Sequence, residues 1–146
     1  MLRFDLIGYV LGQFLLFLAV ALTAPILYGL LTSSGPLRPL LISLFICASA
    51  GGLLTFLRPR PSRELRQREA LLLVASTWAL VPVLGGLPFY LSPEFPGFAD
   101  AFFEAASGFS ASGATVLNDV ERLGKPILFW RCLTHWIGGM GIILLG

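Results

Sequence analysis

Residues 100–115 carry the residue types that could bind and conduct an ion. They read Asp-Ala-Phe-Phe-Glu-Ala-Ala-Ser-Gly-Phe-Ser-Ala-Ser-Gly-Ala-Thr. The pattern predicts a short apolar helix that stops at a glycine-containing turn, and the segment is too short and too rich in Ser and Gly to cross a membrane. A buried turn of this kind can direct backbone carbonyl oxygens at a dehydrated cation, as ion-selectivity filters do. The segment therefore predicts a pore loop.

The turn would form the filter strand of this pore loop, and the helix before it would support the strand. We expect the strand to contain five consecutive residues: Ser110, Ala111, Ser112, Gly113 and Ala114. The glycine allows a positive φ, which lets successive carbonyls face one axis. Taken alone, it could equally be an ordinary glycine at a helix C-terminus. The predicted pore helix carries Glu104 and also Asp100, which suits the N-cap or the first turn.

A carbonyl filter needs several such strands around one axis. One copy of this segment supplies a quarter of a fourfold ring. We therefore expect the other strands to come either from further copies of the chain in a homo-oligomer or from additional pore repeats.

The composition is that of a membrane protein. Of the 146 residues, 56% are hydrophobic and 12% are charged, whereas a soluble domain carries about 25% charged residues. Cys47 and Cys132 lie inside apolar segments, and His135 has no Cys or His at ligand spacing, so the sequence predicts neither a disulfide nor a metal site. An intramembrane hydrolase is disfavoured because the chain has one histidine and no Gly-x-Ser-x-Gly elbow.

Four apolar segments reach the length of about 20 residues that a membrane-spanning helix needs: roughly 6–31, 39–57, 70–91 and 126–146. The first is too long for the apolar region of a signal peptide, which is about 7–15 residues. We expect an all-α integral membrane protein in three parts: two transmembrane helices in 1–57, a linker in 58–69, and a helix–pore-loop–helix unit in 70–146. The last helix ends without a polar flank, which favours a truncated helix and a fragment.

The linker between the second and third spans sets the predicted orientation. It is rich in arginine, at positions 58, 60, 63, 66 and 68, and short basic loops stay cytoplasmic. The N-terminus is then cytoplasmic too, and residues 92–125 face the outside. These outer residues hold five of the eight acids of the chain, which would raise the cation concentration at a pore mouth: Glu94, Asp100, Glu104, Asp119 and Glu121.

Two segments carry a family resemblance. FFEAASGFSASGATV at 102–116 contains the predicted filter, and the last span contains FWR at 129–131 and WIGGMGI at 136–142. Together they resemble the Trk/Ktr/HKT superfamily of potassium transporters, and most closely the bacterial Trk-type membrane subunit. The resemblance implies four successive pore repeats around one pseudo-fourfold pore, with two extra spans before the first repeat. This chain would then be the N-terminal third of such a subunit.

Carried onto this sequence, the resemblance makes Gly113 the filter glycine and places potassium on the backbone of Ala111 and Ser112. Members often have threonines at the filter positions, so Ala111 lacks a hydroxyl but keeps its carbonyl. The implied function is potassium uptake across a bacterial inner membrane, by a channel-like or symport route, with potassium as substrate and no cofactor. The implied partners are the bilayer, the remaining repeats, a cytoplasmic nucleotide-binding regulatory subunit and a second copy in a dimer, and not nucleic acid.

Several residues of the last span keep two interpretations. Arg131 either snorkels to the interface or pairs with an outer acid. Gly138, Gly139 and Gly141 either form a hinge that gates the pore or a close-packing helix face. His135 either faces a polar cavity or is packed and hydrogen-bonded. For the chain as a whole, the alternative to transport is a truncated, non-conducting membrane protein or an assembly partner.

Overall fold

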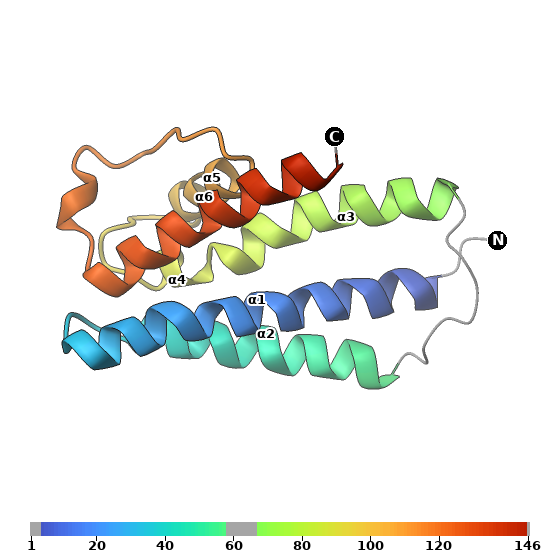
Figure 1. The fold of residues 1–146 in the computed structure, drawn as a ribbon, viewed down its shortest axis with the longest axis horizontal. Coiled ribbons are helices and arrows are strands. Elements are labelled where there is room, and N and C mark those ends of the chain that lie inside the picture. The colour runs from blue at the N-terminus through green and yellow to red at the C-terminus, as the bar shows by residue number, and fades with distance from the viewer. Residues whose placement is uncertain (1–3, 58–66, 146) are drawn as a thin grey trace.

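The computed structural model describes residues 4–57 and 67–145. These residues form helices and no strand, which confirms the predicted all-α class. Figure 1 shows the helices in chain order: α1 Phe4–Thr32, α2 Arg38–Leu57, α3 Gln67–Gly85, α4 Leu87–Tyr90, α5 Phe98–Phe109, the 3-10 helix η1 Val120–Arg122, and α6 Lys125–Leu145.

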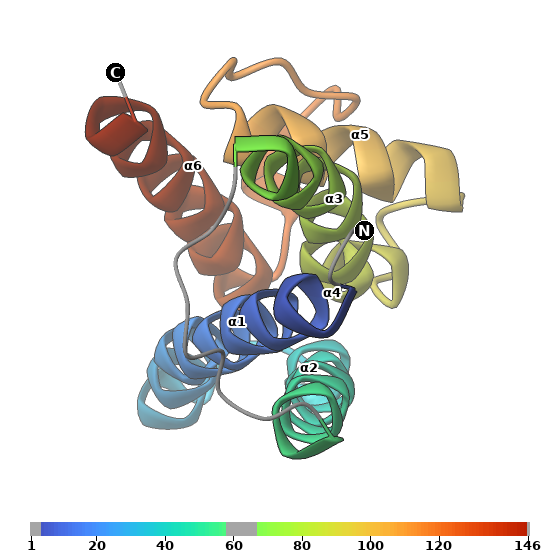
Figure 2. The same cartoon turned by 90° about the vertical axis from the view of Figure 1, so that its right-hand side faces the viewer.

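α1 and α2 form an antiparallel hairpin along one side of the molecule (Figures 1 and 2). Glycines allow the two helices to approach. A Cβ on Gly12 would lie 2.9 Å from Leu54 Cβ, and one on Gly51 would lie 2.9 Å from the Gly12 carbonyl oxygen. Small residues have this role in membrane helices, where close packing replaces the hydrophobic effect as the cause of association. The two N-terminal helices therefore pack as a pair.

A break at Gly85 and Gly86 separates α3 from α4, and side chains from α5 and α6 pack against it. The Gly86 N–H donates to the Pro82 carbonyl at 3.0 Å, so helical hydrogen bonding continues up to the break. The Gly85 carbonyl accepts a 2.9 Å hydrogen bond from Trp130 Nε1 on α6. The place of a Cβ on Gly85 is filled by the ring of Phe109, at the end of α5. A larger residue at position 85 would therefore displace α5.

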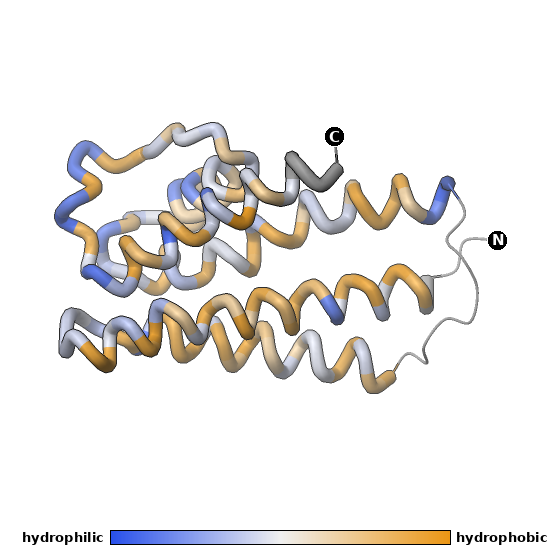
Figure 3. The backbone as a smooth tube through the Cα atoms, in the orientation of Figure 1, coloured by the Kyte–Doolittle hydropathy of each residue, from blue (hydrophilic) through white to orange (hydrophobic). Residues whose placement is uncertain are grey.

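Three helices among the described residues are long and apolar enough to cross a membrane: Leu6–Thr32, Arg38–Leu57 and Gln67–Tyr90. They correspond to the first three predicted spans, and the third includes α4. α6 lies over most of the fourth predicted span and is not one of the three. Apolar side chains remain exposed along the helices, which are largely orange in Figure 3. A bilayer would cover these side chains.

The start of α1, the end of α2 and the start of α3 lie at one end of the molecule, on the right in Figure 1, whereas α6 ends about midway along it. The α1–α2 turn and the segment between α5 and α6 lie at the other end, where hydrophilic residues are frequent (Figure 3). The arginine-rich linker lies mostly outside the described residues. Its expected boundary at 69/70 falls within the first turn of α3, which begins at Gln67.

Candidate functional site

α5 is the predicted pore helix, and it crosses the direction of the long helices (Figures 1 and 2). It begins after Gly97, which has an extended backbone and makes no side-chain cap. Asp100 lies in the first turn, so the expectation of a first-turn acid is confirmed and the N-cap alternative is wrong. A carboxylate there still suits the positive end of the helix dipole. The small residues Ala101 and Ala105 are buried and let α5 approach its neighbours.

The C-terminus of α5 is closed by two backbone hydrogen bonds. The Ser112 N–H donates to the Ser107 carbonyl at 3.0 Å, and the Ala111 N–H donates to the Gly108 carbonyl at 2.9 Å. This is the Schellman pattern, in which the residue after the cap is left-handed. Ala111 is that residue, with φ of 53°. Gly113 follows two residues later with φ of 77°, so it is not the glycine that ends the helix.

The turn beyond α5 presents its backbone to the surface. Residues 111–116 are exposed, and a Cβ on Gly113 would meet no atom within 4 Å. The positive φ, rather than crowding, therefore favours glycine at this position. Ala111 is left-handed while carrying a Cβ, which costs about 1–2 kcal/mol. Backbone strain of this kind tends to cluster at functional sites.

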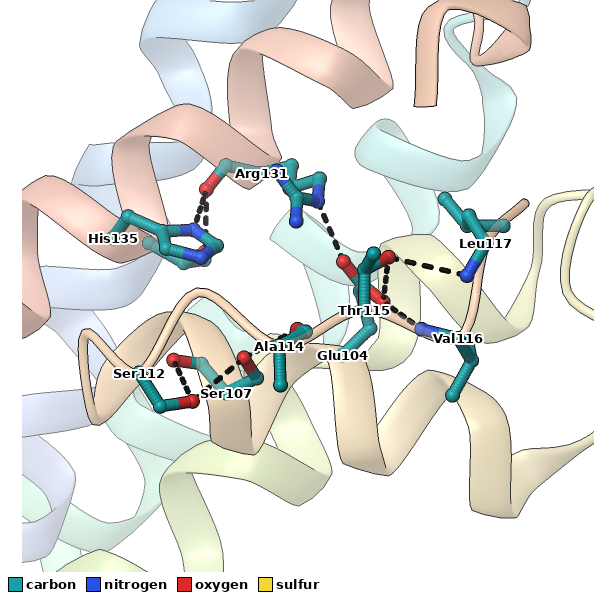
Figure 4. A network of polar contacts seen from close by, with 10 residues as sticks. Glu104, Ser107, Ser112, Ala114, Thr115, Val116, Leu117, Arg131 and His135 are labelled. Carbon is teal, nitrogen blue, oxygen red and sulfur yellow. Dashed lines mark hydrogen bonds and ion pairs between the residues drawn. The ribbon is translucent and has the colours of Figure 1, made fainter. Parts of the chain in front are cut away.

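Ser107, on the last turns of α5, braces this turn from inside. Its hydroxyl donates to the Ala114 carbonyl at 2.5 Å. The Ser112 hydroxyl oxygen lies 2.9 Å from the Ser107 hydroxyl oxygen. Since a serine hydroxyl has one proton to donate, Ser112 is the donor in this second contact. The two contacts, drawn in Figure 4, hold both flanks of Gly113 against the helix.

Glu104, one turn before Ser107, holds the segment that leaves the turn. Its side chain is 0% exposed, and Oε1 lies 2.5 Å from Arg131 Nε on α6. Oε2 accepts hydrogen bonds from the Thr115 hydroxyl at 2.9 Å and from the Val116 N–H at 3.2 Å. Figure 4 shows these groups converging on one carboxylate from α5, α6 and the segment after the turn.

The ion pair decides between the two interpretations of Arg131. Pairing with an acid is confirmed, and snorkelling is wrong, because the Arg131 side chain is only 14% exposed. The pair also corrects the expectation for Glu104. A carboxylate that is fully buried and bound to three donors does not face a pore mouth, so Glu104 is not one of the acids that attract cations there.

The glycines of α6 differ in their surroundings. A Cβ on Gly138 would overlap the Phe109 carbonyl, so the close-packing interpretation is confirmed at this position. A Cβ on Gly139 or Gly141 would meet no atom within 4 Å. A gating role for these two glycines therefore stays a prediction, and they do not pack against the described residues.

Of the two interpretations of His135, the structure supports the hydrogen-bonded one. Its Nδ1 lies 2.8 Å from the Arg131 carbonyl oxygen, so this nitrogen carries the proton. Its Nε2 is buried and has no hydrogen-bond partner among the described residues. Among the residues that the structure describes, no three His, Cys, Asp or Glu side chains lie close enough together to hold a metal ion.

The sequence prediction missed the roles of Ser107 and Thr115. It placed Glu104 correctly on the short helix but wrongly counted it among the acids at the pore mouth. One signal was available. Glu104 and Ser107 are polar residues three apart in an otherwise apolar part of the helix, and residues with that spacing share a helix face. The predicted filter residues do lie together, in the exposed turn between α5 and the Glu104 contact. Arg131 is far from these residues in the sequence and lies near them because α6 packs beside α5.

Comparison with known proteins identifies relatives of the whole chain. The family described as "TrkH: Cation transport protein" matches residues 38–146. The "Trk system potassium uptake protein TrkH" of Vibrio parahaemolyticus is 35% identical over 99% of this chain and 30% of that protein. The protein of the same name from Escherichia coli is 34% identical over the same shares, and the "Trk system potassium uptake protein TrkG" of Escherichia coli is 33% identical over 70% of this chain and 21% of its own length.

A solved structure agrees with these matches. The crystal structure of the potassium transporter TrkH from Vibrio parahaemolyticus superposes with a TM-score of 0.91 and 34% identity, over 99% of this chain and 31% of that one. The chain therefore spans less than a third of the length of the curated relatives it matches, and the match covers their N-terminal portion. The family match over most of the chain, together with the apolar helices and the shared fold, shows that this chain is a multi-pass membrane protein that belongs to the TrkH family of cation transport proteins.

Proposed function

We propose that this chain forms the first pore repeat of a potassium-uptake subunit and carries one quarter of its selectivity filter. The relatives are named potassium uptake proteins, and the proposal extends that substrate to this chain. The observation that carries it is the end of α5. There, an exposed turn with two left-handed residues, Ala111 and Gly113, is braced from inside by the Ser107 hydroxyl of the helix.

Within the turn, the backbone carbonyls of Ala111, Ser112 and Gly113 are the proposed potassium ligands. The Ala114 carbonyl already accepts the Ser107 hydroxyl, so it contributes less than the others to ion coordination. The C-terminal end of α5 adds partial negative charge beside these carbonyls. Together they replace part of the hydration shell of the ion, and the strands of three further repeats supply the rest.

The proposal includes the surroundings of the site. Three further repeats come either from a continuation of the chain or from other copies of it, and the family's dimer and cytoplasmic nucleotide-binding regulatory subunit are the expected partners. The protein lies in a bacterial inner membrane with a cytoplasmic N-terminus. Potassium is the transported substrate, no cofactor takes part, and the chain is not an enzyme.

The test is potassium uptake in a bacterium that lacks its own uptake systems. Two forms are compared: the chain alone, and the chain fused to the part of the Vibrio parahaemolyticus relative that follows the matched region. We expect growth at low potassium and rubidium uptake with the fusion. Gly113→Ser should lower uptake about tenfold or more, because a left-handed side-chain-bearing residue costs about 1–2 kcal/mol where the filter needs one conformation.

The matched control is Gly52→Ser on α2, where a Cβ would also meet no atom within 4 Å. It should leave uptake unchanged at equal membrane expression. Uptake that survives Gly113→Ser would remove this residue from the filter. Uptake by the fusion but not by the chain alone would favour the alternative for the isolated chain, a membrane protein that does not conduct by itself.

A further inference from the structure

We propose that Glu104 and Arg131 are positioning residues that set ion discrimination by holding the exit of the filter turn. The inference rests on the proposed function, because it assigns a role to residues that flank the proposed filter. Neither residue contacts the ion in this account. They act through Thr115 and Val116, which the carboxylate of Glu104 binds directly.

Two anchors on one face of α5 divide the turn between them. Ser107 holds Ser112 and Ala114, and Glu104 holds the next two residues, Thr115 and Val116. The three-residue spacing of the anchors puts them on the same side of the helix. Residues 111–113 thus lie between the C-terminus of α5 and a segment, residues 114–116, that Ser107 and Glu104 bind.

Arg131 makes this arrangement depend on α6. Its guanidinium binds the Oε1 atom of Glu104, while its own carbonyl accepts the Thr134 hydroxyl at 2.7 Å and faces His135 Nδ1 at 2.8 Å. The Arg131 backbone is thereby fixed within α6. A displacement of α6 relative to α5 would move the Glu104 carboxylate, and with it the Thr115 hydroxyl that the carboxylate binds.

The burial of the pair separates it from an ordinary surface ion pair. The Glu104 side chain is fully buried and that of Arg131 nearly so, whereas the Asp119–Arg122 pair in the outer segment has side chains that are 48% and 84% exposed. Removing one charge of a buried pair leaves the other uncompensated. The position of Oε2, which binds the filter exit, would then no longer be held from α6.

A purely structural role is the rival explanation, since the pair also joins α5 to α6. The two roles differ in what they change. A structural pair would lower stability and transport of every ion alike. A positioning pair changes the ratio in which ions are transported, because small shifts of the coordinating carbonyls alter how well the filter replaces the hydration shell of one ion relative to another.

The experiment uses the form that transports in the uptake assay, and it measures rubidium and sodium uptake side by side. We expect Glu104→Gln to lower the rubidium-to-sodium ratio about fivefold, and Arg131→Lys, which keeps the charge but not the planar fork, to lower it less. Purified protein is also heated in potassium and in sodium chloride. The wild type should unfold at a higher temperature in potassium, and Glu104→Gln should lose that difference.

Thr115→Val provides a second route if Glu104→Gln does not reach the membrane. It removes one donor to Oε2 and one acceptor for the Leu117 N–H at an exposed residue, and it leaves the ion pair in place, so it should fold and still lower the ratio. Its control is Thr23→Val, in an exposed helical contact on α1, which should leave the ratio unchanged.

The outcomes are distinct. An unchanged ratio in both Glu104→Gln and Thr115→Val, with wild-type discrimination intact, overturns the positioning role and leaves the proposed function standing. A wild type that takes up no rubidium and shows no potassium-dependent stabilisation rejects the proposed function, and this inference with it.

Discussion

At the scale of single residues, the turn after α5 depends on a few polar groups in apolar surroundings. Ser107 and Glu104 provide hydrogen-bonding partners for four of the residues that follow the helix. Hydrogen bonds in which one partner is charged are shorter and stronger than neutral ones, which suits Glu104 as the anchor nearest Arg131. The turn is thus held by its side-chain partners, although its own surface is exposed.

Ala111 has a left-handed backbone conformation, which alanine disfavours. Ala111→Gly should raise the free energy of unfolding by about 0.5–1 kcal/mol, because relief of about 1–2 kcal/mol of left-handed strain exceeds the added chain entropy of glycine, about 0.5–1 kcal/mol. Thermal unfolding of the purified protein in detergent measures the change. Ala114→Gly serves as the comparison, since Ala114 does not have a positive φ. A loss of stability in Ala111→Gly would show that the left-handed conformation is not adopted.

At the scale of elements, the site depends on how closely α6 approaches the end of α5. Gly138 packs on the Phe109 carbonyl, and Trp130 of α6 donates to the Gly85 carbonyl at the α3–α4 break. These contacts set the position of α6 along α5. Arg131 can reach Glu104 because α6 is held at that position.

Gly138→Ala should therefore separate α5 from α6. The added Cβ would meet backbone atoms, which cannot rotate away, and overpacking of this kind costs about 1–3 kcal/mol. Gly139→Ala is the matched control on the same helix, where a Cβ meets no atom within 4 Å and where alanine gains about 0.8–1.0 kcal/mol of helix propensity. Thermal unfolding should thus move in opposite directions for the two variants. Equal shifts would contradict the close contact.

At the scale of the whole molecule, the helix ends define two faces with different composition. The start of α1, the end of α2 and the start of α3 lie at one face, and the segment that follows the filter turn lies at the other (Figure 1). Basic short loops stay in the cytoplasm, so we predict from the arginine-rich linker that the first face is on the inside. Under the proposed function, the filter turn would then be reached from the outside.

Cysteine labelling tests this orientation. With Cys47 and Cys132 replaced by serine, single cysteines at Ser34 and Gln67 should react differently with a membrane-impermeant thiol reagent added to intact cells. Position 34, in the α1–α2 turn, should be labelled, and position 67, at the start of α3, only after permeabilisation. The reverse pattern would place the filter turn on the cytoplasmic side.

The sequence predicted the elements well because their signals are local. Apolar length indicated the first three spans, and the sequence after Asp100 indicated a short apolar helix that ends at a Ser- and Gly-rich turn, since both depend on residues close together in the chain. The residue types also favoured carbonyl coordination over metal ligation or hydrolysis, which stays a prediction. They did not show whether Gly113 or Ala111 would end α5, because Ala111 adopts a conformation that its type disfavours.

Tertiary structure decided the partners of the buried charges. In the sequence, Glu104 looked like one more outer acid, and Arg131 could either snorkel or pair with an outer acid that the sequence did not identify. Their contact joins residues 27 apart, and it forms only because glycines let α6 pack against α5. A charge inside the membrane needs a partner. The sequence therefore indicated that such a charge would have a partner, but it did not identify which residue that partner is. The partner depends on how α5 and α6 cross, and a short stretch of sequence does not determine that crossing.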